Sequence, residues 1–208
     1  MMKRWIALLL ATVLCFSVSA CGGNDETVAN ENKVEVNEEI VTTEELTLED
    51  GTVLTQGFDK DGNKISEVAM LPDGTRREVC YDKEGNQISE VSEMPDGTCY
   101  EFHYDADGSK ISEAVKQTDG TRREFCYDKD GNQISEIAEM PDGSVYEMGF
   151  GKDGNIISEV TKMADGSVYT HQYDENGNHI FESSTLADGS YHEFQYDKDG
   201  NIVNEIHK

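Results

Sequence analysis

One glutamate recurs at a fixed place in the sequence and is the first candidate for chemistry. It occurs seven times at intervals of 23 residues, as Glu67, Glu90, Glu113, Glu136, Glu159, Glu182 and Glu205. Two neighbouring carboxyl groups can act as general acid and as nucleophile or base. A catalytic pair is a single site, however, whereas these glutamates are equivalent copies. We therefore interpret them as a structural column of a repeat protein.

A second recurring position carries rings that could hold a ligand by stacking. It is occupied by Tyr100, Tyr146, Tyr169 and His192. Flat ring faces can stack on a sugar, so these four residues are our candidate ligand-stacking site. The same rings could instead be cross-strand partners of core aromatic residues. The sequence leaves both interpretations open.

The segment Asp128-Lys129-Asp130-Gly131-Asn132 resembles the start of an EF-hand calcium loop. The resemblance ends at Gln133, because an EF-hand has glycine at that sixth position, and no helices are expected on either side. Turn formation already accounts for each residue type in the segment. We therefore expect weak association of cations along the Asp turns and no selective metal site.

Other chemical motifs are missing from the sequence. It has no nucleophile motif, phosphate-binding loop or metal-ligand spacing, and its histidines are scattered over different repeat positions. They are His103, His171, His179, His192 and His207. We expect neither enzymatic activity nor a cofactor.

The chain is strongly acidic, with 17 Lys and Arg against 43 Asp and Glu and a net charge of −26. Nucleic-acid binding needs clustered basic side chains, so nucleic acid is excluded as a partner. The acidic surface could simply keep an exposed protein soluble, or it could attract cations or a basic partner.

The first twenty residues predict export. Lys3 and Arg4 precede an apolar run that is too short to span a membrane, as in a secretory signal peptide covering residues 1–20. Its end, Val18-Ser19-Ala20-Cys21, resembles the bacterial lipobox. That resemblance implies a lipid on Cys21 and a protein anchored to the cell membrane, facing outside the cytoplasm. An ordinary secretory peptide without lipidation is the alternative.

Residues 21–43 are rich in Glu and Asn and poor in aromatic residues, so we expect a disordered tether there. Glu44 and Leu48 then fit the register of the repeats, which predicts a degenerate half-repeat that caps the array. The array, residues 44–208, contains Cys80, Cys99 and Cys126. Equivalent positions two repeats apart lie about four strands apart, too far for a disulfide, and we expect free thiols.

Seven 23-residue repeats, each with two turns, predict the fold. One turn is of the type Asp128-Lys129-Asp130-Gly131 and the other of the type Met140-Pro141-Asp142-Gly143. Asp at the first position and Gly at the fourth are typical of a type I turn with a glycine bulge. Two hairpin turns per repeat predict an all-β antiparallel meander of about 14 strands.

An aromatic residue occurs once in every repeat, at Phe58, Tyr81, Tyr104, Tyr127, Phe150, Tyr173 and Tyr196. Alternation along the strand puts this column on one face. In the next strand the aliphatic residues are three apart, which predicts a β-bulge near the Ser-Glu pair. So many strands should curve or coil with the aromatic column inside. Closure of the coil, self-association or a partner would then cover that column.

The pattern of Tyr-Asp, Gly-Asn and Pro-Asp-Gly in each repeat resembles the YD repeat of bacterial Rhs proteins and teneurins. The resemblance covers about 160 residues. Phe58-Asp59, Phe150-Gly151 and Ser109 depart from it. MORN-like hairpin repeats are a weaker match, because their Gly-Trp signatures are missing.

These features predict a non-enzymatic, surface-anchored lipoprotein whose repeat array binds a carbohydrate or a protein at the cell envelope. The alternative is a structural, spacer or immunity-like module related to Rhs systems, with no ligand of its own.

Overall fold

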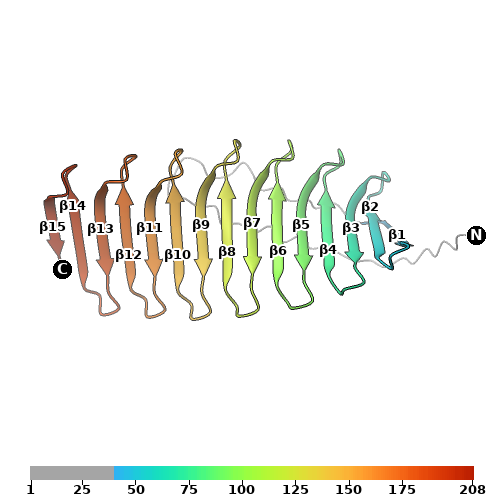
Figure 1. The fold of residues 1–208 in the computed structure, drawn as a ribbon, viewed down its shortest axis with the longest axis horizontal. Helices are drawn as coiled ribbons and strands as arrows, with labels where there is room; N and C mark the ends of the chain where they lie inside the picture. The colour runs from blue at the N-terminus through green and yellow to red at the C-terminus, as the bar shows by residue number, and fades with distance from the viewer. Residues whose placement is uncertain (1–39) are drawn as a thin grey trace, which may run out of the picture. The chain divides into compact units, whose positions relative to one another are not determined.

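The computed structural model describes residues 40–208, which form strands and turns without a helix. The strands are β1 (Thr42–Thr47), β2 (Val53–Phe58), β3 (Lys64–Met70), β4 (Arg76–Tyr81), β5 (Gln87–Glu93), β6 (Cys99–Tyr104), β7 (Lys110–Lys116), β8 (Arg122–Tyr127), β9 (Gln133–Glu139), β10 (Val145–Phe150), β11 (Ile156–Lys162), β12 (Val168–Tyr173), β13 (His179–Thr185), β14 (Tyr191–Tyr196) and β15 (Ile202–His207). Neighbours in sequence are neighbours in the sheet, as Figure 1 shows. The predicted antiparallel meander is confirmed. Within these residues no helix could span a membrane.

Strand β1 is the predicted half-repeat. It pairs antiparallel with β2 from Thr42 to Thr47, although it lacks an aromatic residue. The predicted signal peptide, the lipidation site Cys21 and nearly all of the tether lie outside the described residues.

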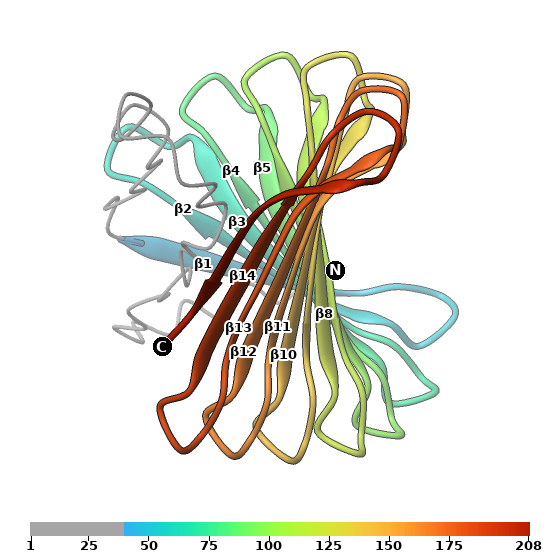
Figure 2. The ribbon, with the colours of Figure 1, turned by 90° about the vertical axis from the view of Figure 1, so that its left-hand side faces the viewer.

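The chain divides into two compact units, the first ending at Ile111 and the second running from Ser112 to Lys208. In the first, β1 to β6 pair in sequence order. In the second, β8 to β15 do the same, and Figure 2 shows these strands running side by side between two rows of turns. Each unit is a single layer of strands.

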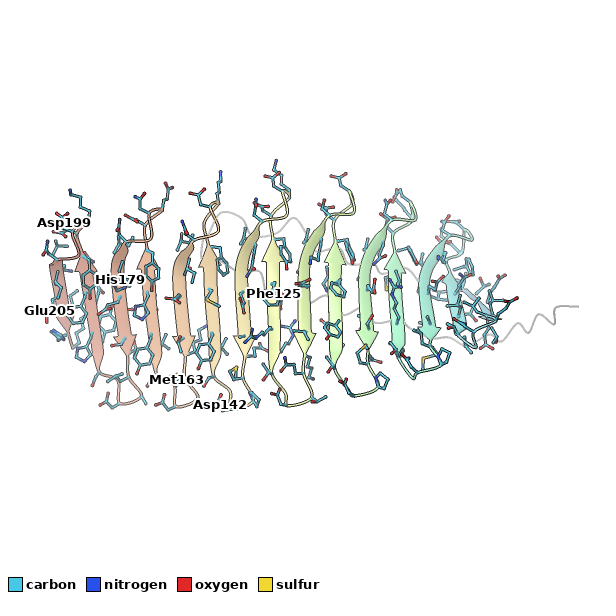
Figure 3. All side chains as sticks on the ribbon, viewed as in Figure 1. Phe125, Asp142, Met163, His179, Asp199 and Glu205 are labelled. Atoms are coloured by element: carbon cyan, nitrogen blue, oxygen red, sulfur yellow. The ribbon has the colours of Figure 1, made fainter. Side chains whose placement is uncertain are left out.

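Both predicted turn types have the expected geometry. The Gly131 N–H donates to the Asp128 carbonyl (3.0 Å), and the Asp128 N–H donates to the Asn132 carbonyl (2.9 Å). Gly131 has φ of +83° and Gly143 of +87°, a region that costs a residue with a side chain about 1 to 2 kcal/mol. Asp199 lies in a turn of the first type and Asp142 in a turn of the second type. The two turn types lie at opposite ends of the strands (Figure 3).

The predicted bulge is present in the second strand of hairpins with the first turn type, namely β2–β3, β4–β5, β8–β9, β10–β11, β12–β13 and β14–β15. In β8 and β9, Cys126 pairs with Ser135 and Tyr127 with Gln133, so Ile134 has no opposite residue. The extra residue restores the alternation of side chains for the rest of β9.

Strand pairing defines two faces in each unit. Phe125 lies opposite Glu136, so the aromatic residues and the recurring glutamates share one side, which we call the aromatic face. Glu124 lies opposite Ile137 on the other side, together with Cys126. This is the aliphatic face.

The aromatic column does not form a fully packed core. All seven column rings are only half-buried, whereas Cys126, on the aliphatic face, is 2% exposed. A single layer has no second sheet to cover its rings, and the spacing of residues within one repeat could not reveal this.

The expectation that the repeat cysteines are not bridged to one another is confirmed for Cys80 and Cys99, which form no disulfide. Cys80 is buried and Cys99 is half-buried.

Half-burial of the aromatic column sets the expected cost of removing a ring. Tyr127→Ala should lower the free energy of unfolding by about 1 to 2 kcal/mol, between the values for a packed core and for an exposed site. Tyr127→Phe is the control. It removes only the hydroxyl that donates to Glu113 Oε1 (2.8 Å) and should cost about 1 kcal/mol. A loss above about 3 kcal/mol in urea melts of Tyr127→Ala would show that the ring is covered in solution.

Candidate binding surface

The candidate stacking residues of the second unit lie in one row across the aromatic face. Tyr146 pairs with Thr161, Thr161 with Tyr169, Tyr169 with Ser184, and Ser184 with His192. The structure therefore brings Tyr146, Tyr169 and His192 together, and we call them the tyrosine row. Small side chains separate the rings, so each ring stands above its neighbours.

The tyrosines of this row are among the more exposed large residues. Tyr146 is 39% exposed and Tyr169 is 37% exposed, whereas His192 is half-buried. The rings lie two strands apart, and strands are about 4.8 Å apart, so the spacing between rings is about 9.6 Å. The row offers a regular series of ring edges and faces to solvent.

The equivalent row of the first unit is different. Tyr100, which is 39% exposed, belongs to this unit, and the position one repeat earlier is Arg77. The Arg77 guanidinium donates to both oxygens of Glu90, at 2.6 and 2.7 Å. This ion pair lines a hollow of about 460 Å³ together with Tyr104.

The recurring glutamates accept hydrogen bonds from the aromatic column. The Tyr127 hydroxyl donates to Glu113, and the Tyr173 hydroxyl donates to Glu159 at 2.6 Å. The bond to Glu159, with burial, raises the pKa of Tyr173 to about 12. The glutamates therefore link neighbouring hairpins on the aromatic face.

The Asp turns use their carboxylates internally. Asp128 Oδ1 accepts the N–H groups of Asp130 and Asn132, both at 2.9 Å, and the Asn132 amide donates to Asp128 Oδ2 at 3.0 Å. The side-chain bond from Asn132 is the main reason why the pKa of Asp128 is lowered. These contacts are those of a turn, as the sequence predicted.

The histidines are less scattered than their repeat positions indicated. His171 lies opposite Glu182 in the register of β12 and β13, and His179 lies near both of them. The structure therefore brings together three residues of the second unit that occupy different repeat positions. Folding the hairpin about its predicted turn at Asp174 would have brought the three residues together, but comparing repeat positions one strand at a time could not.

No protein-family model and no curated protein matches the sequence. The fold is similar to solved structures of TCP domains. The TCP10 domain of Danio rerio CPAP is 18% identical, the match covers 79% of this chain and 88% of that chain, and the TM-score is 0.43. The SAS-4 TCP domain of Drosophila melanogaster, in complex with a proline-rich motif of Ana2, is 15% identical. That match covers 80% and 90% of the two chains, with a TM-score of 0.39. These similarities concern the fold alone.

The turn carboxylates predict how stability depends on pH. Backbone N–H donors lower the pKa of Asp119 and Asp142, and donors from Asn side chains lower that of Asp128. A lowered folded pKa stabilises the fold fully above the unfolded value of about 3.9, and that stability is lost as the pH falls through the folded pKa. The free energy of unfolding should therefore fall steeply below about pH 4.

Urea melts between pH 7 and pH 3 would measure this loss, and an NMR titration of the Asp carboxyl carbons would give the pKa values directly. Protonation also relieves the repulsion within an acidic chain, and parallel melts at high salt control for that effect. Equal stability at pH 5 and pH 3 would contradict the prediction.

Proposed function

We propose that the array is a non-enzymatic binding scaffold of YD-repeat type, whose tyrosine row takes an extended, proline-rich and basic segment of another protein. The observation that carries the proposal is the row itself, with exposed rings at a constant interval and Thr161 and Ser184 between them. Such a row recognises a ligand that repeats at the same interval.

The interval favours a polyproline II helix. This helix advances about 3.1 Å per residue with three residues per turn, hence about 9.3 Å per turn. The rings are about 9.6 Å apart. A peptide in β conformation advances about 6.8 Å for every two residues, so its repeat does not match the spacing of the rings. Proline-rich segments also bind aromatic surfaces at a low cost in entropy.

Charge favours a basic segment. The chain carries a net charge of −26, and Glu159 and Glu182 lie on the same face as the tyrosine row. Lys or Arg side chains of a bound segment would be attracted to these carboxylates. A sugar polymer offers no such complementarity, so a carbohydrate is the less favoured ligand.

The test uses a fluorescent peptide of Pro-Pro-Lys triplets, with a peptide of Gly-Ser-Lys triplets for comparison. The chain should bind the first more tightly in fluorescence anisotropy. Tyr146→Ala combined with Tyr169→Ala should weaken binding about tenfold or more, because two exposed ring contacts are lost. Tyr191→Ala is the matched control, since Tyr191 lies opposite Thr185 on the aliphatic face.

Equal affinity for both peptides would contradict the proposal. So would a loss of affinity in Tyr191→Ala as large as that in the variant of Tyr146 and Tyr169. Binding of an oligosaccharide that depends on Tyr146 and Tyr169 would replace the protein ligand by a carbohydrate. No binding in either assay would favour the structural or spacer module.

We also propose that the protein is lipid-anchored at the cell envelope, on the basis of the lipobox-like residues that end at Cys21. Cys21→Ala should release the protein into the medium or leave its signal peptide uncleaved, because no lipid chain then holds it to the membrane. Phase partitioning in detergent measures this, and Cys99→Ala, at a cysteine of the array that forms no disulfide, is the control. Unchanged partitioning of Cys21→Ala would contradict the anchor.

A further inference from the structure

Two histidines and a glutamate converge on the hairpin of β12 and β13. His171 Nδ1 lies 3.3 Å from His179 Nε2, and Glu182 Oε2 lies 3.8 Å from the first nitrogen and 3.9 Å from the second. All three residues belong to the second unit and are half-buried. His179 is the first residue of β13, directly after the turn that begins at Asp174, and is labelled in Figure 3.

The repeat itself directs these three positions toward one another. In the first repeat the same positions hold Gln56, Lys64 and Glu67. Gln56 Nε2 and Lys64 Nζ both donate to Glu67 Oε2, at 2.7 and 3.0 Å. The convergence is therefore a property of the hairpin, and the sixth repeat fills it with two imidazoles.

The distances fit the coordination of a metal ion. Metal–ligand distances of about 2.0 to 2.2 Å in a tetrahedron place ligand atoms about 3.3 to 3.6 Å apart. The two nitrogens are already at this separation, and the carboxylate oxygen needs to move by only a few tenths of an ångström. Without metal, one ring N–H donates to the other ring, and a bound ion would displace that proton to solvent.

Neighbouring groups hold the ligands in place. The rings of Tyr173 and Tyr196 lie 5.3 and 4.8 Å from that of His179. These ring contacts limit the orientations that the His179 imidazole can adopt. About a third of each ligand side chain is exposed, which leaves room for water at the fourth position.

We propose that His171 Nδ1, His179 Nε2 and a carboxylate oxygen of Glu182 bind one divalent transition-metal ion of the Zn²⁺ class. Two imidazoles and one carboxylate suit Zn²⁺, Ni²⁺ or Cu²⁺, whereas Ca²⁺ and Mg²⁺ require oxygen ligands. This site differs in chemistry and place from the Asp turns, which the sequence had singled out.

The last hairpin pairs two histidines in a different arrangement. His192 and His207 lie with ring centroids 4.8 Å apart, their Nδ1 atoms in contact. His207 turns its other nitrogen, Nε2, toward Glu205. The ring nitrogens and the carboxylate of this hairpin therefore do not point toward one common position. This pair provides an internal control.

The test is isothermal titration of the untagged protein with Zn²⁺ in an excess of Mg²⁺, which occupies weak acidic sites. One ion should bind per chain at micromolar concentrations and raise the melting temperature. His171→Phe and His179→Gln should each weaken binding at least about tenfold. Both substitutions introduce residues that other repeats accept at these positions, as Phe125 and Gln133 show, so the fold should persist.

His192→Gln should bind Zn²⁺ as the wild type does. Absence of saturable binding by the wild type would overturn the proposal, as would unchanged affinity in both ligand variants or an equal loss in His192→Gln. NMR spectra of the imidazole nitrogens would identify the ligands, and shifts confined to His192 and His207 would likewise overturn it.

Discussion

The chain reverses at both ends of the strands through turns that end in glycine, with φ between +75° and +93°. In each turn a carbonyl accepts the glycine N–H, and the first residue also donates to the residue after the glycine, as from Asp128 to Asn132. These two hydrogen bonds allow only one register for the pair of strands that the turn connects. Every column of side chains depends on that register, because a slip of one residue would move each side chain to the other face. The Asp carboxylates stabilise the same turns from outside the sheet.

A single layer cannot bury either of its faces completely, and the chain compensates in two ways. On the aromatic face, hydroxyl–carboxylate bonds such as that from Tyr173 to Glu159 join one hairpin to the next. Arg77 and Glu90 make a comparable ion pair across β4 and β5. Stability is then a sum of contacts between neighbours, as in other repeat proteins. The high negative charge keeps such exposed faces from associating freely.

The turns, the meander, the bulge and the half-repeat at β1 could be predicted because they depend on local residue types at short range. Burial could not, since it depends on whether a second layer exists, and the half-buried Tyr127 has the same sequence signature as a core ring. The site at His171 needed one further step. His171 and His179 are eight residues apart with a turn between them, and only the register across that turn shows that both approach Glu182.

Because the columns are fixed, a change of residue in one copy alters chemistry without altering the fold. The position of Arg77 in the first unit becomes tyrosine at Tyr146 and Tyr169 in the second, and the position of Gln56 becomes His171. An ion pair, or a hydrogen bond from a side-chain amide, that contacts only the neighbouring strand is thus replaced by an exposed ring or a metal ligand. Tyr100 of the first unit and Arg123 of the second lie in the same column as Arg77. The second unit carries three consecutive rings in that column, Tyr146, Tyr169 and His192, together with the histidine cluster. Binding should therefore reside in the second unit, with the first supplying more of the same sheet.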